Sequence, residues 1–261
     1  TNNLHKRIAL ATIKSIGTSR AKVMLSFMIA TAFLSMWTSN NSTTLMMLPI
    51  GLAILKREEQ LGANISLFAP ALMLSIAYSA SIGGTGTLVG TPPNLVFVTF
   101  MEEVYQIEID FLSWMRLGVP VAIVMLISAW LILTKLVFPT KFIATQETKL
   151  KLNEMLIELG PLNKDEIKIA FIFSLAVVAW MTSRIIREYF GIGLEDAGVA
   201  IIISILLFVI PSSINKKEDL MQWDKTSKLP WGLLILFGGG LSLAAQVSSS
   251  GLGLWIGQGL T

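Results

Sequence analysis

Residues 37–44 read WTSNNSTT and residues 83–94 read GGTGTLVGTPPN, and both polar, small-residue stretches interrupt long uncharged segments. Unpaired backbone groups are costly in the hydrocarbon of a membrane. Irregular backbone survives there only where protein buries it or where it lines a wet cavity. Transporters place broken helices of this kind at their substrate and ion sites. The two breaks therefore predict part of a membrane carrier.

The composition also favours a membrane protein. Charged residues make up 14% of the chain and hydrophobic residues 53%, whereas soluble domains carry about 25% charged residues. The absence of cysteine excludes disulfides and thiol catalysis, and the single histidine, His5, cannot build a His-based metal site. We therefore expect no enzyme, and the net charge of +3 does not favour nucleic-acid binding. Because the chain starts and stops abruptly, we expect a fragment of a larger protein.

The first break lies within a predicted hairpin. Between Lys22 and Lys56 there are 33 uncharged residues, more than the roughly 20 that one span needs. Basic residues mark the cytoplasmic side of a membrane, and here they stand at both ends. We therefore expect a re-entrant hairpin that enters along 22–38, turns at 39–43 and leaves along 44–55.

The second break lies within a predicted crossing. Between Glu59 and Glu102 there are 42 uncharged residues, and the exit at 102–110 is acidic. Pro92 and Pro93 cannot continue a helix from the preceding turn, because neither has a backbone N–H. One helix that crosses from the basic to the acidic side, broken at 83–94, fits this pattern.

The charge pattern divides the chain into segments. We expect an interfacial helix at 1–17, a hairpin at 18–57, a broken transmembrane helix at 58–115, a transmembrane helix at 116–138, a cytoplasmic interfacial helix at 139–166, two transmembrane helices at 167–228 and a new uncharged segment at 229–261. All but three of the 20 Lys and Arg residues then lie on the cytoplasmic side. The exceptions are Arg116, Arg184 and Arg187, of which the last two could reach outward from a short helix.

The residue types in the two breaks favour an ion site. Hydroxyl, amide and free carbonyl oxygens suit a hard cation such as sodium, and the N-termini of half-helices suit an anion. Neither break contains Lys, Arg, Asp or Glu, so neutral donors and a nearby cation would hold the anion. The open alternative is that these small residues only allow close helix packing, as in a purely structural membrane subunit.

Several motifs carry a resemblance to a known family. The motifs are SMWTSN at 35–40, TTLMMLP at 43–49, SIGGT at 81–85, GTPPN at 90–94 and LHKRIAL at 4–10. Together they resemble the divalent-anion/sodium symporter family, which includes bacterial dicarboxylate transporters and the human citrate and sulfate carriers. The resemblance implies an all-α polytopic membrane protein with two inverted repeats, each with a re-entrant hairpin and a broken helix. This chain would hold the first repeat and, at 229–261, the start of the second.

The resemblance also implies site residues and an architecture. Transport parts at 18–57 and 58–115 would move in an elevator-like way against scaffold helices at 167–228, in a homodimer in the bacterial inner membrane. The implied sodium ligands are Ser35, Ser39, Asn40, Gly84 and Gly90. The implied substrate-binding residues are Asn40, Asn41, Ser39, Thr91 and Pro92. The chain departs from the family at Asn41, where Thr is most frequent, and this puts the choice of substrate in doubt.

From these patterns we expect a sodium-coupled secondary carrier that imports C4-dicarboxylates such as succinate, malate and fumarate across the lipid bilayer. The alternatives are a sodium-coupled carrier for sulfate, citrate or another oxyanion, and a dicarboxylate exchanger. Exchangers of the family tend to place a basic residue at a sodium position. None is visible here, so the resemblance favours symport.

Overall fold

The structure, a computed structural model, describes most of the chain. The described residues are 4–16, 19–60, 62–139, 153–154, 156–191, 196–214, 219–228, 231–252, 255 and 258. Their regular structure is helical, apart from isolated bridge residues that include Pro211 and Asp219, which pair with each other. The predicted all-α fold is thereby confirmed. Half of the predicted interfacial helix at 139–166 and parts of 229–261 lie outside the described residues.

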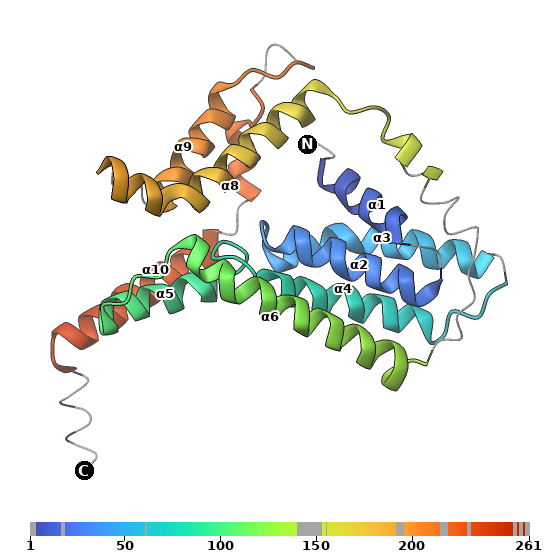
Figure 1. The fold of residues 1–261 in the computed structure, drawn as a ribbon, viewed down its shortest axis with the longest axis horizontal. Coiled ribbons are helices and arrows are strands. Elements are labelled where there is room, and N and C mark those ends of the chain that lie inside the picture. Colours follow the sequence, from blue (N-terminus) through green and yellow to red (C-terminus); the bar gives the residue numbers. More distant parts are fainter. Residues whose placement is uncertain are drawn as a thin grey trace. The chain divides into compact units, whose positions relative to one another are not determined.

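Figure 1 labels the helices in chain order. They are α1 (Leu4–Ile16), α2 (Arg20–Ser35), α3 (Asn40–Gln60), α4 (Phe68–Gly84), α5 (Pro92–Tyr105), α6 (Phe111–Leu131), continued by a π-helical segment (Ile132–Val137), α8 (Lys164–Phe190), α9 (Asp196–Val209), a 3-10 helix (Trp223–Lys228) and α10 (Trp231–Ser249). The chain forms two compact units, Thr1–Leu206 and Leu207–Thr261. Both sequence breaks lie in the first unit.

The core of the first unit lies between the two arms of the hairpin and α4. The buried faces of these helices are mainly apolar, with a few buried hydroxyl side chains among them, at Ser26 and Thr31 of α2 and Ser75 and Ser79 of α4. The buried core residues include Val23, Met24 and Phe27 of α2, Met47, Ile50 and Ile54 of α3, and Phe68, Leu72 and Ile76 of α4. This packing holds α2 and α3 against α4, so both breaks are attached to one rigid core.

A buried ion pair closes the base of the hairpin. Arg20 begins α2, and its guanidinium contacts the carboxylate of Glu58, near the end of α3, at 2.7 and 2.9 Å. Arg20 also donates to the carbonyl of Asn64 at 3.1 Å and lies over the ring of Phe68. The two arms are therefore antiparallel with both outer ends on one side, the arrangement that the predicted hairpin needs.

Two described helices are long and apolar enough to cross a membrane. They are Phe111–Val137 and Lys164–Tyr189. Asn163 caps the second by accepting a hydrogen bond from the N–H of Glu166, whose side chain accepts one in return from the N–H of Asn163. Arg7 of α1 pairs with Glu166 at 3.4 Å and donates to the carbonyl of Gly160 at 2.8 Å. The basic N-terminal helix is thereby joined to the start of α8.

Replacing Arg20 with Met should destabilise the first unit by about 3 kcal/mol, because it leaves the charge of a buried carboxylate without its guanidinium partner. The side chain of Glu58 is only 3% exposed, so water cannot take the place of the guanidinium. The check is the thermal unfolding midpoint of the purified protein in detergent. Lys56→Met is the matched control, because Lys56 is exposed on the same arm. Equal midpoints for the two variants would contradict the role of the ion pair.

Candidate functional site

Four helix ends meet where the two breaks approach each other. Ser35 ends α2, Asn40 begins α3, Gly84 ends α4 and Pro92 begins α5. The hydroxyl of Ser35 lies 2.8 Å from Oδ1 of Asn40. The amide of Asn40 lies directly against Gly84, where an added Cβ would stand 2.3 Å from Oδ1. Gly84 is therefore required by the close approach of the Asn40 side chain.

Oxygen atoms are concentrated at this point. The hydroxyl of Ser35 lies 2.6 Å from the carbonyl oxygen of Ala80 and 2.8 Å from Oδ1 of Asn40. A hydroxyl has one proton and can donate to only one of the two acceptors at a time. These three oxygen atoms therefore have more acceptor lone pairs than the single hydroxyl proton can satisfy. Such a set of neutral oxygens, beside the carbonyl ends of α2 and α4, suits a hard cation.

The second break is held by side chains that donate to its backbone. Nδ2 of Asn94 donates to the carbonyls of Gly84 at 2.8 Å and Thr87 at 2.7 Å. The hydroxyl of Thr87 donates in turn to the carbonyl of Met36, directly before the first break. Gly90 lies so close that a Cβ there would stand 2.5 Å from the carbonyl oxygen of Gly84. These contacts tie the two breaks together.

Helix α6 covers the second break. The indole N–H of Trp114 donates to the carbonyl of Thr85 at 3.0 Å. An added Cβ at Gly118 would stand 2.7 Å from the same carbonyl oxygen, so α6 packs directly on the backbone of the break. Sequence reasoning missed Asn94, Thr87 and Trp114 as members of the site, although the first two lie in the glycine-rich stretch it singled out.

The structure brings together four of the predicted sodium ligands. Ser35, Gly84 and Gly90 are buried and Asn40 is half-buried beside them. The fifth, Ser39, is exposed at the hairpin tip, where its hydroxyl donates to the hydroxyl of Ser42 at 2.8 Å and accepts from the Ser42 N–H at 3.3 Å. The side chain of Ser39 is thus engaged within the tip.

The predicted anion-binding residues lie nearer the surface. Ser39 and Asn41 are exposed, and Thr91 and Pro92 are half-buried. The first N–H groups of a helix have no partners within it and attract anions. At α5 two of these donors are missing, because its first residues are Pro92 and Pro93. The N-terminus of α3 and the amides of the tip are therefore the stronger anion donors.

Aromatic packing surrounds the hairpin tip. The ring of Trp37 stacks on Phe111 of α6 at 6.2 Å and meets Phe173 of α8 edge-on at 5.3 Å between centroids. Phe111 also stacks on Trp180 of α8 at 5.2 Å. Offset and edge-on pairs are the favourable aromatic geometries. The tip therefore packs against both α6 and α8 through apolar rings.

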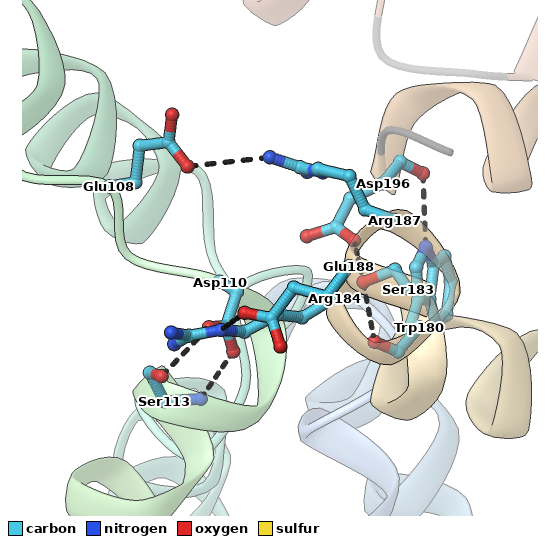
Figure 2. Close-up of polar contacts among 9 residues, drawn as sticks. All are labelled: Glu108, Asp110, Ser113, Trp180, Ser183, Arg184, Arg187, Glu188 and Asp196. Carbon is cyan, nitrogen blue, oxygen red and sulfur yellow. Dashed lines mark hydrogen bonds and ion pairs between the residues drawn. The ribbon is translucent and has the colours of Figure 1, made fainter. Parts of the chain in front are cut away.

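An ion-pair network joins the segment before α6 to the end of α8 (Figure 2). Arg184 contacts Asp110 at 3.3 Å and Glu188 at 2.9 Å, and Arg187 contacts Glu108 at 3.3 Å. These are two of the three basic residues that the charge rule left outside the cytoplasmic side. Their partners in this segment, Glu108 and Asp110, belong to the acidic exit at 102–110, so the two exceptions are explained by compensating carboxylates.

Asp110 also caps α6. Its carboxylate accepts from the N–H of Ser113 at 2.8 Å and from the hydroxyl of Ser113 at 2.9 Å. Burial raises the pKa of Asp110, but the two hydrogen bonds from Ser113 and the pairing with Arg184 outweigh it, so the pKa lies below its usual value. The ionised form is the one that the fold stabilises.

Replacing Asp110 with Asn should lower the thermal unfolding midpoint at neutral pH and have no effect in acid. Because the pKa of Asp110 is lower in the folded protein than in the unfolded one, the ionised carboxylate stabilises the fold at pH values above the unfolded pKa of about 3.9. This stabilisation is lost as the pH falls through the pKa of the folded protein. Asn caps helices as well as Asp does, so the variant can keep the hydrogen bond from the Ser113 N–H while it removes the charge and the second oxygen, which pairs with Arg184. The difference between the midpoints, measured from pH 7 to pH 2, should shrink as the pH falls below about 3.9. Glu103→Gln, an exposed residue of the same acidic exit, is the control, and a constant difference between D110N and the unmodified protein would contradict the charge effect.

Comparison with known proteins identifies relatives of this chain. A family profile described as "Sodium:sulfate symporter transmembrane region" matches residues 1–261. The sodium-dependent dicarboxylate transporter SdcS of Staphylococcus saprophyticus is 39% identical over 267 residues, 99% of this chain and 51% of the relative. The SdcS proteins of Staphylococcus aureus strains USA300 and bovine RF122 are 40% and 41% identical over 269 residues, with the same coverage.

The chain thus spans about half the length of the curated relatives it matches. The family resemblance inferred from the motifs is confirmed, and these named relatives are transporters rather than enzymes. Because the profile match extends from the first residue to the last, the chain belongs to the sodium:sulfate symporter family of membrane transport proteins.

Proposed function

We propose that this chain supplies a sodium and anion half-site to a carrier that couples sodium entry to the import of C4-dicarboxylates. The observation that carries the proposal is the group of neutral oxygens formed by Ser35, Asn40 and Ala80 beside Gly84. It lies next to the N-terminus of α3, so one place offers oxygen ligands and anion donors together. The names of the relatives support a dicarboxylate as cargo.

Sodium occupies the deeper position in this proposal. The ligands are the hydroxyl of Ser35, Oδ1 of Asn40 and backbone carbonyls near Gly84 and Gly90, and Ser39 contributes from the tip. Three of these residues, Ser35, Gly84 and Gly90, are buried. Bound sodium would accept the lone pairs that the single proton of Ser35 leaves unused.

The dicarboxylate occupies the shallower position. One carboxylate accepts hydrogen bonds from Nδ2 of Asn40, from Asn41 and Ser39 and from the N-terminus of α3, with Thr91 and Pro92 lining the other side. Asn40 contacts both cargoes, because its oxygen faces Ser35 and its nitrogen is left for the anion. Sodium then offsets the negative charge of the cargo, which couples the two binding events.

The transport cycle in this proposal moves residues 18–115 against scaffold residues 167–228, in a homodimer in a bacterial plasma membrane. The hairpin and α4 share one core, which supports their moving as a body. Residues 18–115 contact α8 through the aromatic rings of Trp37 and Phe111, which belong to a small apolar cluster, and through the ion pairs of Arg184 and Arg187. The ion pairs separate at low cost, because exposed ion pairs contribute about 0–1 kcal/mol each.

A second candidate cargo is sulfate or another oxyanion. The description of the family names sulfate, and neutral donors at a helix N-terminus bind any such anion. The exposed Asn41 side chain, larger than the threonine that is most frequent in the family, is the residue that bears most directly on this choice.

The test is uptake of radiolabelled succinate by the full-length protein in proteoliposomes, with and without an inward sodium gradient. The expected result is succinate accumulation that requires sodium and saturates as the sodium concentration rises. No accumulation is expected when potassium replaces sodium. Uptake that ignores sodium but needs internal dicarboxylate would indicate exchange. Uptake of sulfate but not of succinate would show that the transported anion is sulfate, and the proposed site would remain the same.

Two variants test the site itself. Asn40→Ala should abolish sodium-dependent uptake, because it removes the amide that both cargoes contact. Gly84→Ala should raise the sodium concentration for half-maximal uptake by at least about tenfold, a change of about 1.4 kcal/mol, because its methyl group displaces Oδ1 of Asn40. Both proteins should still fold, since a flexible side chain relieves the clash. Gly198→Ala is the control, because a Cβ there meets nothing within 4 Å. Full sodium-dependent uptake by N40A would contradict the assignment of Asn40 to the binding site.

A further inference from the structure

We propose that Asn94 is the residue that positions the sodium half-site, acting through the backbone of the second break and not as a ligand. This inference rests on the proposed function and adds to it a residue that the family comparison does not assign. Asn94 lies in the first turn of α5 and is only 7% exposed. Nothing in the sequence marks it as a hydrogen-bond donor to another helix.

The contacts of Asn94 are directed at the ends of the irregular stretch. Its amide nitrogen gives one hydrogen bond to the carbonyl of Gly84, the last residue of α4, and one to the carbonyl of Thr87 within the break. Both N–H groups of the amide are thus used. Without them the carbonyl of Gly84 would lose the amide donor and the carbonyl of Thr87 would keep only the longer hydrogen bond from the N–H of Gly90 at 3.4 Å, which is costly for buried groups.

The neighbouring prolines explain why a side chain takes this role. Pro92 and Pro93 have no backbone N–H, so the start of α5 offers few main-chain donors toward the end of α4. The amide of Asn94 supplies two donors from the same turn. Its own backbone N–H is used locally, since it donates to the carbonyl of Thr91 at 3.1 Å.

A short chain of contacts links Asn94 to the cation ligands. Asn94 fixes the carbonyl of Gly84, and Gly84 lies directly against the amide of Asn40. Asn40 in turn contacts the hydroxyl of Ser35 at 2.8 Å. A shift of Gly84 therefore moves the surface on which Asn40 rests. An N–H donor cannot coordinate a cation, so the contribution of the Asn94 nitrogen is positional.

Asn94→Asp tests the proposal, because it keeps the shape and one oxygen but replaces the donating nitrogen with a second oxygen. We expect the sodium concentration for half-maximal succinate uptake to rise by at least about tenfold, equivalent to about 1.4 kcal/mol. The maximal rate per folded protein should change much less. The sodium-induced rise of the thermal unfolding midpoint, measured against potassium, should be lost. Asn64→Asp is the matched control, because Asn64 is exposed in the loop before α4.

Three results would overturn the proposal. An unchanged sodium requirement with a lower maximal rate would show that Asn94 only supports folding. A lowered sodium requirement in N94D would show that a charge at this position acts on the cation directly, which contradicts a role limited to donating hydrogen bonds. If N94D does not fold, Asn94→Ser, which keeps one donor on a shorter side chain, should shift the sodium requirement in the same direction, and no shift in that variant would likewise count against positioning.

Failure of the proposed function is recognised separately. If the unmodified protein takes up its anion without any need for sodium and shows no sodium-induced stabilisation, the symport proposal fails and the role of Asn94 in it fails too. If the unmodified protein depends on sodium and the Asn94 variants keep its affinity, only the positioning role is wrong.

Discussion

Backbone carbonyls that lose their helical partners inside an apolar protein must find other donors, and the packing around the second break follows from this need. The donors come from different elements. Asn94 reaches back from α5, Trp114 reaches across from α6 and Thr87 reaches from the break to Met36 of the hairpin. The break therefore determines how closely α6 approaches and where the hairpin tip lies. Asn94 and Trp114 hold carbonyls of residues 84–87, next to the glycine against which the side chain of Asn40 lies.

Charge is distributed unequally between the two ends of the first unit. At the base of the hairpin, Arg20 and Glu58 form a buried pair whose side chains are 11% and 3% exposed. Near the end of α8, the side chain of Arg184 is 63% exposed and pairs with carboxylates through water-accessible contacts. A buried pair is strongly destabilising to break, whereas exposed pairs contribute little. The hairpin arms are thus firmly joined to each other, and α8 is attached to the segment before α6 by weak contacts.

The sequence located the two breaks because polar runs inside uncharged segments are visible in composition alone. It placed the helix ends less well. The first polar run continues into α3, which begins at Asn40, and the second starts within α4, which ends at Gly84. Composition does not show where the last backbone hydrogen bond of a helix falls. Asn94 and Trp114 were missed because their partners are carbonyls, which leave no trace in residue types. The role of Arg184 depends on Asp110, which is distant in sequence and close only in the fold.

The neutrality of the two breaks has a consequence for voltage. Ser35, Asn40 and the carbonyl of Gly84 carry no charge, and neither break contains an ionisable side chain. In the proposed cycle these ligands return empty without carrying charge through the electric field. The membrane potential, worth about 2.3 kcal/mol per elementary charge per 100 mV, then acts on this half-site only while ions occupy it. A charged lining would instead couple the empty return to voltage, and one direction of the cycle would slow as the membrane polarises.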